Sequence, residues 1–178
     1  MSKKEIRLLG LSVAKQNFAL LIVGVVFRGN LWLDGVISSM IEANDQDHMT
    51  SISNTIKRCK QYSQLHAIML DSKEHISEPE LAQLAKATGV PIIAISKASP
   101  PDRQLSEKSE VKRFDLLVNG KHLSALAAGA ERKEVEEIVA IGTKPAASVP
   151  EAVRVADLVM RGLNSHHLAL RPMKTTEQ

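Results

Sequence analysis

A chain of 178 residues is long enough for one well-packed domain and too short for two large ones. Hydrophobic residues make up 44% of the chain and charged residues 24%, a balance that excludes a disordered or fibrous protein. Aromatic residues make up only 3%, which argues against a stacking platform for single-stranded nucleic acid. The formal net charge of +3 is mildly favourable for a polyanionic partner but far below that of a dedicated electrostatic binder.

Cysteine usage and the amino-terminal sequence bear on the compartment. Cys59 is the single cysteine, so neither an intramolecular disulfide nor a zinc site built on several thiolates can form. Residues 1–10 lack the long apolar segment of a signal peptide. The apolar run at 18–27 has about half the length that a membrane-spanning helix needs. We therefore expect a cytoplasmic protein that does not associate with membranes.

Three apolar segments near the start of the chain are predicted to be strands. Residues 6–13 and 18–27 are mostly apolar, and the second segment is rich in β-branched side chains. The Gly29-Asn30 dipeptide can take positive φ angles and close a tight hairpin before the next apolar segment, 31–42. The pattern predicts an antiparallel meander of three strands.

A helix and a buried strand are predicted next. Asp45 or Asp47 can cap the helix, whose apolar positions recur at helical spacing until about Tyr62. The segment at 66–71 then runs apolar for several positions and stops on Asp71. A carboxylate at the end of a buried strand is the first indication of a site in this sequence.

The following residues carry the signals of a β-α-β unit. Ser77 and Glu80 match a capping box that begins a helix, and Gly89 ends that helix after Thr88. Another buried strand follows at 90–96. Two strands joined by such a helix are expected to be parallel, with a right-handed connection.

The last third of the chain is predicted to be mainly helical. Residues 97–112 have no apolar period and are expected to form an exposed loop, followed by a short strand at 114–120. Amphipathic helices are predicted at 131–142 and 150–163, and the second is expected to close near Gly162.

The order β-β-β-α-β-α-β, followed by carboxyl-terminal helices, predicts an α/β fold of ribonuclease H-like architecture. Its mixed sheet would consist of an antiparallel three-strand meander followed by the parallel β-α-β unit, with flanking helices. We expect one domain over residues 1–163 and an irregular tail over residues 164–178. In this architecture the first and fourth strands lie side by side at the centre of the sheet.

This arrangement would place Asp71 beside Ser12, near the end of the first strand. Phosphodiester hydrolysis commonly uses a divalent metal, and Mg²⁺ prefers carboxylate oxygens. Asp71 is one candidate catalytic residue and metal ligand, and Asp47 or Asp45 is a plausible second. Ser12 offers a metal no charge. The alternative for Asp71 is a structural role, in which it hydrogen-bonds the backbone of its own strand-to-helix loop.

Other candidate residues carry weaker signals. His48 and His75 lie near the proposed carboxylates and can assist catalysis or contact phosphate, but polar surface residues have the same pattern. Lys97 begins the basic, exposed loop and is a candidate contact for nucleic acid. Acidic residues are interleaved in that loop, so a solvated loop without a ligand is the alternative.

Three longer stretches resemble a known family. The stretches VVFRGNLWLDGV, AIMLD followed by LAKATGVPIIAIS, and VPEAVRVADLV are similar to the largely archaeal, uncharacterised family related to endonuclease V, some of whose members are called endonuclease dU. The resemblance extends from about Ile6 to Leu163. It implies a ribonuclease H-like fold and cleavage of DNA or RNA near a deaminated base, with Mg²⁺ or Mn²⁺ as the metal.

The family pattern can be carried over to individual residues. Asp71 matches the family's acid at the end of the fourth strand, and Asp47 matches an acid before the first helix. Asp34 also matches, although a structural role in the hairpin is an alternative. The first strand of the family usually reads Gly-Ile-Asp-Asp-Gly, whereas this chain has Ser12 and Val13 at the two acidic positions. The loop after the fifth strand also looks shorter than is usual in the family.

The resemblance implies roles for two more residues and leaves three functions open. Arg28 and Trp32 flank the hairpin that lies on the substrate side in the relatives, so Arg28 can contact phosphate and Trp32 can stack on a base. Hairpin packing is the alternative for both. For Arg154 we expect a structural ion pair. The protein is an endonuclease with a rearranged site, a relative that binds nucleic acid or protein without cutting, or a domain with an assembly role.

Overall fold

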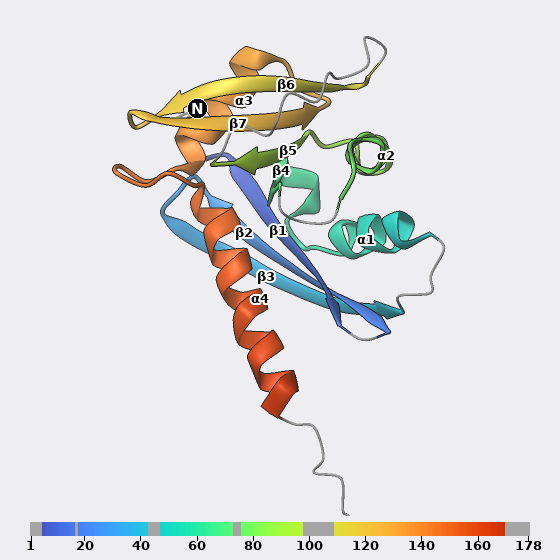
Figure 1. Ribbon diagram of the computed structural model, residues 1–178. Helices are drawn as coiled ribbons and strands as arrows, with labels where there is room; N and C mark the ends of the chain where they lie inside the picture. Colours follow the sequence, from blue (N-terminus) through green and yellow to red (C-terminus); the bar gives the residue numbers. More distant parts are fainter. Residues whose placement is uncertain (1–4, 17, 43–46, 73–75, 98–108, 170–178) are drawn as a thin grey trace, which may run out of the picture.

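The computed structural model describes residues 5–16, 18–42, 47–72, 76–97 and 109–169. These residues form a seven-stranded mixed sheet in the order β3-β2-β1-β4-β5-β7-β6, with helices on both faces (Figure 1). The predicted ribonuclease H-like α/β fold is confirmed. In chain order the elements are β1 (Arg7–Gln16), β2 (Ala19–Arg28), β3 (Trp32–Glu42), α1 (His48–Lys57), the 3₁₀ helix η2 (Tyr62–Gln64), β4 (Leu65–Asp71), α2 (Glu78–Thr88), β5 (Ile92–Ser96), β6 (Val111–Val118), β7 (Lys121–Ala128), α3 (Arg132–Gly142) and α4 (Glu151–Ala169).

The antiparallel meander and the β-α-β unit form as predicted. β1 pairs with β2, and β2 with β3, in antiparallel register, and Gly29 takes the positive φ angle of 60° that the hairpin requires. β4 and β5 pair in parallel, joined by α2. The capping box is present, since the Ser77 amide donates a 2.6 Å hydrogen bond to Glu80, and Gly89 ends the helix at φ 64°.

Three expectations about element boundaries were wrong. The first helix ends at Lys57 and not near Tyr62, which lies in η2. β6 begins inside the segment expected to be a loop, and it forms a hairpin with β7, a strand that the sequence did not indicate. The last helix continues past Gly162 to Ala169, so the expected tail begins as helix. A single glycine lowers the stability of a helix by only about 1 kcal/mol relative to alanine. The hydrogen bonds of the turns after Gly162 outweigh this loss.

Each face of the sheet carries its own hydrophobic core. One core joins the sheet to α3 and α4, and the other joins it to α1 and α2. Because successive side chains of a strand point to opposite faces, Leu8 of β1 belongs to the α4 core and Leu9 to the α1 core. In Figure 1, α4 lies across β1 and β2. The two cores fix the face to which every residue of β1 and β4 points.

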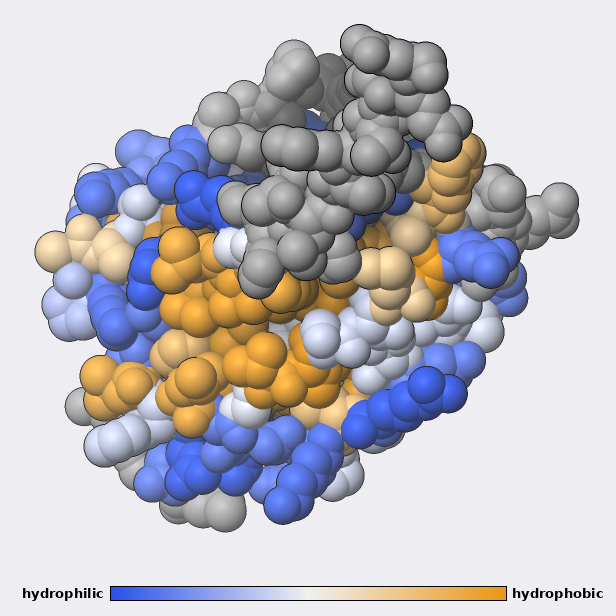
Figure 2. Space-filling view, turned by 90° about the horizontal axis from the view of Figure 1, so that it is seen from below, coloured by the Kyte–Doolittle hydropathy of each residue, from blue (hydrophilic) through white to orange (hydrophobic). Residues whose placement is uncertain are grey.

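The edge strand β3 exposes apolar side chains. Figure 2, the view from below, shows an apolar area bordered by hydrophilic residues. The exposed large hydrophobic residues of β3 are Trp32, Leu33, Val36 and Met40. Exposed apolar residues on an edge strand are unusual in an isolated domain and often mark a contact surface. None of the helices in the described ranges is both long and apolar enough to cross a membrane.

Candidate functional site

Ser12 and Asp71 lie next to each other on neighbouring central strands. β1 and β4 pair in parallel with Leu11 opposite Leu70, and Ser12 and Asp71 are the next residues along each strand. Ser12 is only 2% exposed, whereas Asp71 is half-buried. The predicted adjacency of these residues at the centre of the sheet is confirmed.

Both side chains point to the α4 face of the sheet. Leu8 of β1 and Met69 of β4 belong to the core on that face, and Ser12 and Asp71 follow them at even spacing. Gly10, between Leu8 and Ser12, faces the backbone of α4 directly. On this face, β1 and α4 are therefore the first elements to search for a second metal ligand beside Asp71.

Among the α4 side chains that the structure describes, at 151–164, neither acid faces Asp71 as such a ligand. The side chains that it buries against the sheet are those of Ala152, Val153, Ala156 and Met160. Its two described acids have other partners. Glu151, at the helix start, contacts Lys144 and Arg154, and Asp157 forms a 2.7 Å ion pair with Arg161. The α4 side chains that belong to the core on this face are thus apolar.

Asp47 lies on the other side of the sheet. It is the N-cap of α1, and its Oδ1 accepts a 3.3 Å hydrogen bond from the Thr50 amide, as the sequence predicted for one of two acids. α1 packs through Met49 and Ile52 on the face opposite α4. The other candidate cap, Asp45, lies outside the described residues, as does His75.

These donors do not fit a divalent-metal site. The described residues contain no group of three or more His, Cys, Asp and Glu side chains that could hold a metal ion. Asp71 stands beside a buried serine, and Asp47 already serves as a helix cap on the opposite face. A metal-binding or catalytic role for Asp71 and Asp47 stays a prediction.

The comparisons with known proteins identify the family. A profile of the family described as endonuclease dU matches residues 4–164. The chain belongs to the endonuclease dU family. It is 30% identical to a UPF0215 protein of Methanosarcina acetivorans, over 90% of this chain and 92% of the relative. A UPF0215 protein of Methanosarcina mazei is 31% identical, with the same two shares.

Solved structures share the fold of this endonuclease dU family member. A protein of unknown function from Archaeoglobus fulgidus has a TM-score of 0.70 at 18% identity, covering 89% of this chain and 98% of its own. Endonuclease V from Bacillus subtilis has a TM-score of 0.65 at 13% identity, covering 93% of this chain and 83% of its own. An Argonaute from A. aeolicus has a TM-score of 0.58 at 13% identity and covers 88% of this chain, which matches 28% of the Argonaute. At these identities the likeness shows the fold alone.

Ser12 and Val13, the two positions where the resemblance predicts acids, point to opposite faces here. Val13, the second of them, faces α1 and lines a cavity of about 380 Å³ with Lys15 and His48. His48 Nε2 lies 3.0 Å from Glu80 and so links α1 to α2. Burial raises the pKa of Glu80, but the hydrogen bonds from Ser77 and His48 outweigh it and leave that pKa below its usual value. His48 is thus engaged on the face away from Asp71.

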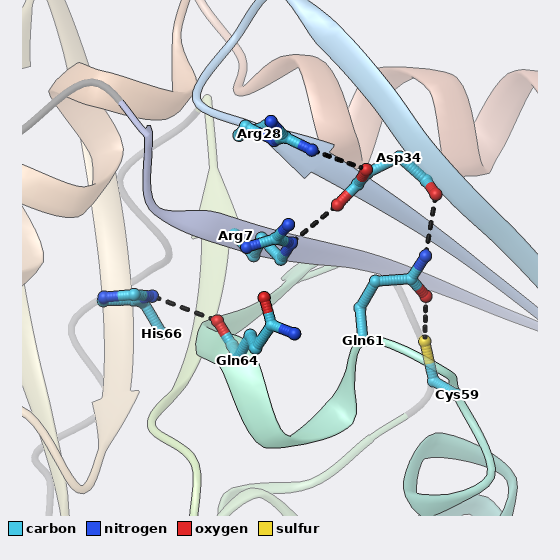
Figure 3. Close-up of polar contacts among 7 residues, drawn as sticks. All are labelled: Arg7, Arg28, Asp34, Cys59, Gln61, Gln64 and His66. Atoms are coloured by element: carbon cyan, nitrogen blue, oxygen red, sulfur yellow. Dashed lines mark hydrogen bonds and ion pairs between the residues drawn. The ribbon is translucent and has the colours of Figure 1, made fainter.

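Arg28 and Asp34 belong to a polar network at the other end of the sheet (Figure 3). Asp34 accepts a 2.6 Å hydrogen bond from Arg7 Nε and a 3.1 Å bond from Arg28 Nη2. The bond from Arg7, supported by Arg28, holds the pKa of Asp34 below its usual value against the effect of burial. Gln61 Nε2 donates to the Asp34 carbonyl at 2.8 Å, and Gln61 Oε1 accepts a hydrogen bond from Cys59 Sγ at 3.2 Å. These contacts favour the structural alternative for Asp34.

The structure separates Arg28 and Trp32 from Asp71. Arg28 pairs with Arg7 at the start of β1, and Ser12 lies further along the same strand, at a distance of about 16 Å. Trp32 is 71% exposed beside Arg28. Nucleic-acid contact by these two residues stays a prediction, and it would involve a surface apart from Ser12 and Asp71.

Lys97 lies at the same edge of the sheet as Asp71. Asp71 is opposite Ile95 in the parallel pairing of β4 and β5, and the exposed Lys97 comes directly after the last residue of β5. Of the three predicted nucleic-acid contacts, it alone is placed near the candidate acid. Its role stays a prediction.

Glu151 is a buried acid that the sequence analysis did not single out. Its carboxylate accepts hydrogen bonds from Arg154 at 2.6 and 2.9 Å and from Lys144 at 2.8 Å. The bonds from Arg154, with those from Lys144, outweigh the effect of burial and lower the pKa of Glu151 to about 2. The expected structural ion pair of Arg154 is confirmed. The signal that could have found its partner is the spacing of Glu151 and Arg154 on one helix face.

Replacing this acid, Glu151→Gln, should make the protein less stable at pH 7 by about 1–2 kcal/mol, because two cations lose their partner. The wild-type carboxylate is stabilising above its unfolded pKa of about 4.5. This stabilisation is lost as the pH falls toward the folded pKa of about 2. Urea unfolding at pH 7 and pH 3 should therefore show a smaller difference between the two proteins at pH 3. The exposed acid in Glu136→Gln is the control, and a difference independent of pH would contradict the assignment.

Proposed function

We propose that this protein binds nucleic acid carrying deaminated bases and that its metal-dependent cleavage is weak or absent. The observation that carries the proposal is the buried hydroxyl of Ser12 beside Asp71, at a position where the resemblance to the family predicts an acid. A metal held by one carboxylate keeps most of its hydration shell, and a neutral hydroxyl does not offset the cost of removing it. Neither α4 nor Asp47 supplies the missing charge among the described residues.

The binding half of the proposal is supported by family and charge. Members of the endonuclease dU family and the endonuclease V structures share this fold, and the chain has a calculated isoelectric point near 9.0. The exposed Lys97 stands at the edge of the sheet where Asp71 ends β4. Lysine at such an edge can contact a phosphate without reading the base sequence.

Oligonucleotide binding tests the proposal. We expect the protein to bind a uracil- or hypoxanthine-containing oligonucleotide more tightly than the unmodified sequence, with affinity falling roughly tenfold or more between 50 and 200 mM salt. Fluorescence anisotropy measures this binding, and denaturing gels with Mg²⁺ or Mn²⁺ measure cleavage. Lys97→Gln should reduce the salt dependence, whereas Lys57→Gln, on α1, is the matched control. Efficient cleavage by the wild-type protein that is lost in Asp71→Asn would overturn the proposal.

An assembly role is the second candidate function. The exposed apolar side chains of β3, an edge strand, favour it because such a surface commonly contacts another protein. The oligonucleotide experiment also separates the two functions. A protein whose role is assembly would show neither salt-dependent binding nor cleavage.

A further inference from the structure

A cavity on the α2 face of the sheet lies apart from Ser12 and Asp71. Its volume is about 480 Å³, and it opens at the carboxyl ends of β4 and β5. Ligands of α/β proteins commonly bind at this end of parallel strands. The sheet side of the cavity carries Ser96, Ser124 and Arg113, and the helix side carries Ile76 and Pro79. Residues at alternate positions of β5, β6 and β7 point into it, away from the α4 face.

Two polar groups of this cavity have no hydrogen-bond partner among the described residues. Ser124 is 3% exposed, and its Oγ is buried without a partner. The Nε of Arg113 is also buried without a partner. Arg113 and Ser124 lie on adjacent strands, since Arg113 is opposite Leu126 and Ser124 is two residues before Leu126 on the same face. Buried polar groups in folded proteins nearly always have a hydrogen-bond partner. Two neighbouring polar groups that face a cavity and lack such partners therefore indicate a ligand.

The chemistry of the two groups limits the ligand. A guanidinium can only donate hydrogen bonds, and a serine hydroxyl can donate one. A ligand group that accepts hydrogen bonds from both side chains must carry several acceptor oxygens, as a phosphate does. The cavity is larger than a phosphate alone needs, and Ala94 and Leu126 add apolar surface to it. The remaining space suits an organic group attached to the phosphate.

The acidic residues near the cavity limit how it can hold a negatively charged ligand. Glu78 lines it, and the exposed Asp115 is opposite Ser124 in register. The ligand is therefore held by directed hydrogen bonds to Arg113 and Ser124 and not by a strong positive field. Glu78 can accept a hydrogen bond from a hydroxyl or amino group of the ligand, which favours a small polar molecule over a polyanion.

We propose that this cavity binds a small phosphorylated molecule, with its phosphate on Arg113 Nε and Ser124 Oγ. The inference does not depend on the proposed nucleic-acid function, because it concerns the opposite face of the sheet from Asp71. It also gives a role to Arg113, which the sequence offers only as one of several basic residues near an exposed loop.

NMR titration of the full chain tests the site directly. Inorganic phosphate and adenosine 5′-monophosphate should shift the Arg113 Nε–H signal and the Ser124 amide signal, and adenosine, which lacks the phosphate, should not. Ser124→Ala and Arg113→Lys should each weaken phosphate binding at least fivefold, while Ser38→Ala and Arg58→Lys, at distant exposed positions, should leave it unchanged. No shift at Arg113 and Ser124 at millimolar phosphate would overturn the proposal. Shifts there with an oligonucleotide but not with the mononucleotide would overturn the assignment to a small molecule.

Thermal unfolding gives a second readout for the same variants. Ser124→Ala removes a buried hydroxyl that lacks a protein partner, so without phosphate it should be at least as stable as the wild type. The rise in Tm that phosphate causes in the wild type should be lost in this variant. A variant that unfolds at a lower Tm without phosphate would show that the hydroxyl has a structural partner, and would overturn the site.

Discussion

Ser12→Asp should make the folded protein responsive to Mn²⁺ and Mg²⁺. Neighbouring strands lie about 5 Å apart, so the new carboxylate would stand next to Asp71 on the same face. Without metal, the variant should be less stable than the wild type by roughly 2–4 kcal/mol, because position 12 is buried and the two carboxylates repel each other. A metal at about a hundred times its Kd should restore about 2.7 kcal/mol. Thermal unfolding with EDTA and with Mn²⁺ measures both effects.

Two further variants separate charge from size in this experiment. Ser12→Asn has nearly the same volume as aspartate but no charge, so it should be destabilised without a response to Mn²⁺. Adding Asp71→Asn to Ser12→Asp should remove the response again. A folded Ser12→Asp protein that ignores Mn²⁺ would show that the site lacks more than this one acid. Cleavage of a uracil-containing oligonucleotide by Ser12→Asp would show that the remaining catalytic groups are intact.

The adjacency of Ser12 and Asp71 was predictable because it depends on local signals of different kinds. Gly29-Asn30 indicates the hairpin, and the Ser77–Glu80 capping box with Gly89 bounds the helix of the β-α-β unit. Together these signals leave few topologies, and the chosen one puts the first and fourth strands side by side. Backbone pattern was sufficient for this part of the site.

The faces of the sheet were not predictable in the same way. Alternation shows that Ser12 and Val13 point to opposite sides. The middle residues of β1 and β4 are buried on both faces and mostly apolar, so their sequence does not tell the two faces apart. The packing of Leu8 and Gly10 against α4 shows which side Ser12 faces. That information decides that Asp47, capping α1, lies away from Asp71.

Two other features escaped sequence analysis because their signals are weak. β7 contains several alanines, which have low strand propensity, and its burial between β5 and β6 overrides that preference. Phosphate contact was expected of Arg28 because it flanks the hairpin that lies on the substrate side in the relatives. Its contact with Asp34 depends on the register of β2 and β3, including the irregularity between Val26 and Phe27.

Gly10→Ala is expected to be the most damaging single substitution in the chain. A Cβ at this position would lie 2.0 Å from the carbonyl oxygen of Ala152 and 2.7 Å from the amide nitrogen of Val153. Both atoms belong to the backbone of α4, so no change of rotamer can relieve the overlap. The helix would have to move away from β1 along the face where Ser12 and Asp71 lie. We expect a loss of about 4 kcal/mol or more in the free energy of unfolding, measured by urea denaturation.

The control for this substitution is a glycine within α4 itself. A Cβ at Gly162 meets no atom within 4 Å, and alanine is the better helix former, so Gly162→Ala should stabilise the protein by up to about 1 kcal/mol. The same Gly→Ala change should thus lower the free energy of unfolding at position 10 and raise it at position 162. This difference would identify the close approach of β1 and α4 as the cause of the loss. If Gly10→Ala unfolded at nearly the wild-type urea concentration, α4 would not be held against β1 at this distance. The placement of Ser12 on the face covered by α4 would then lose its basis.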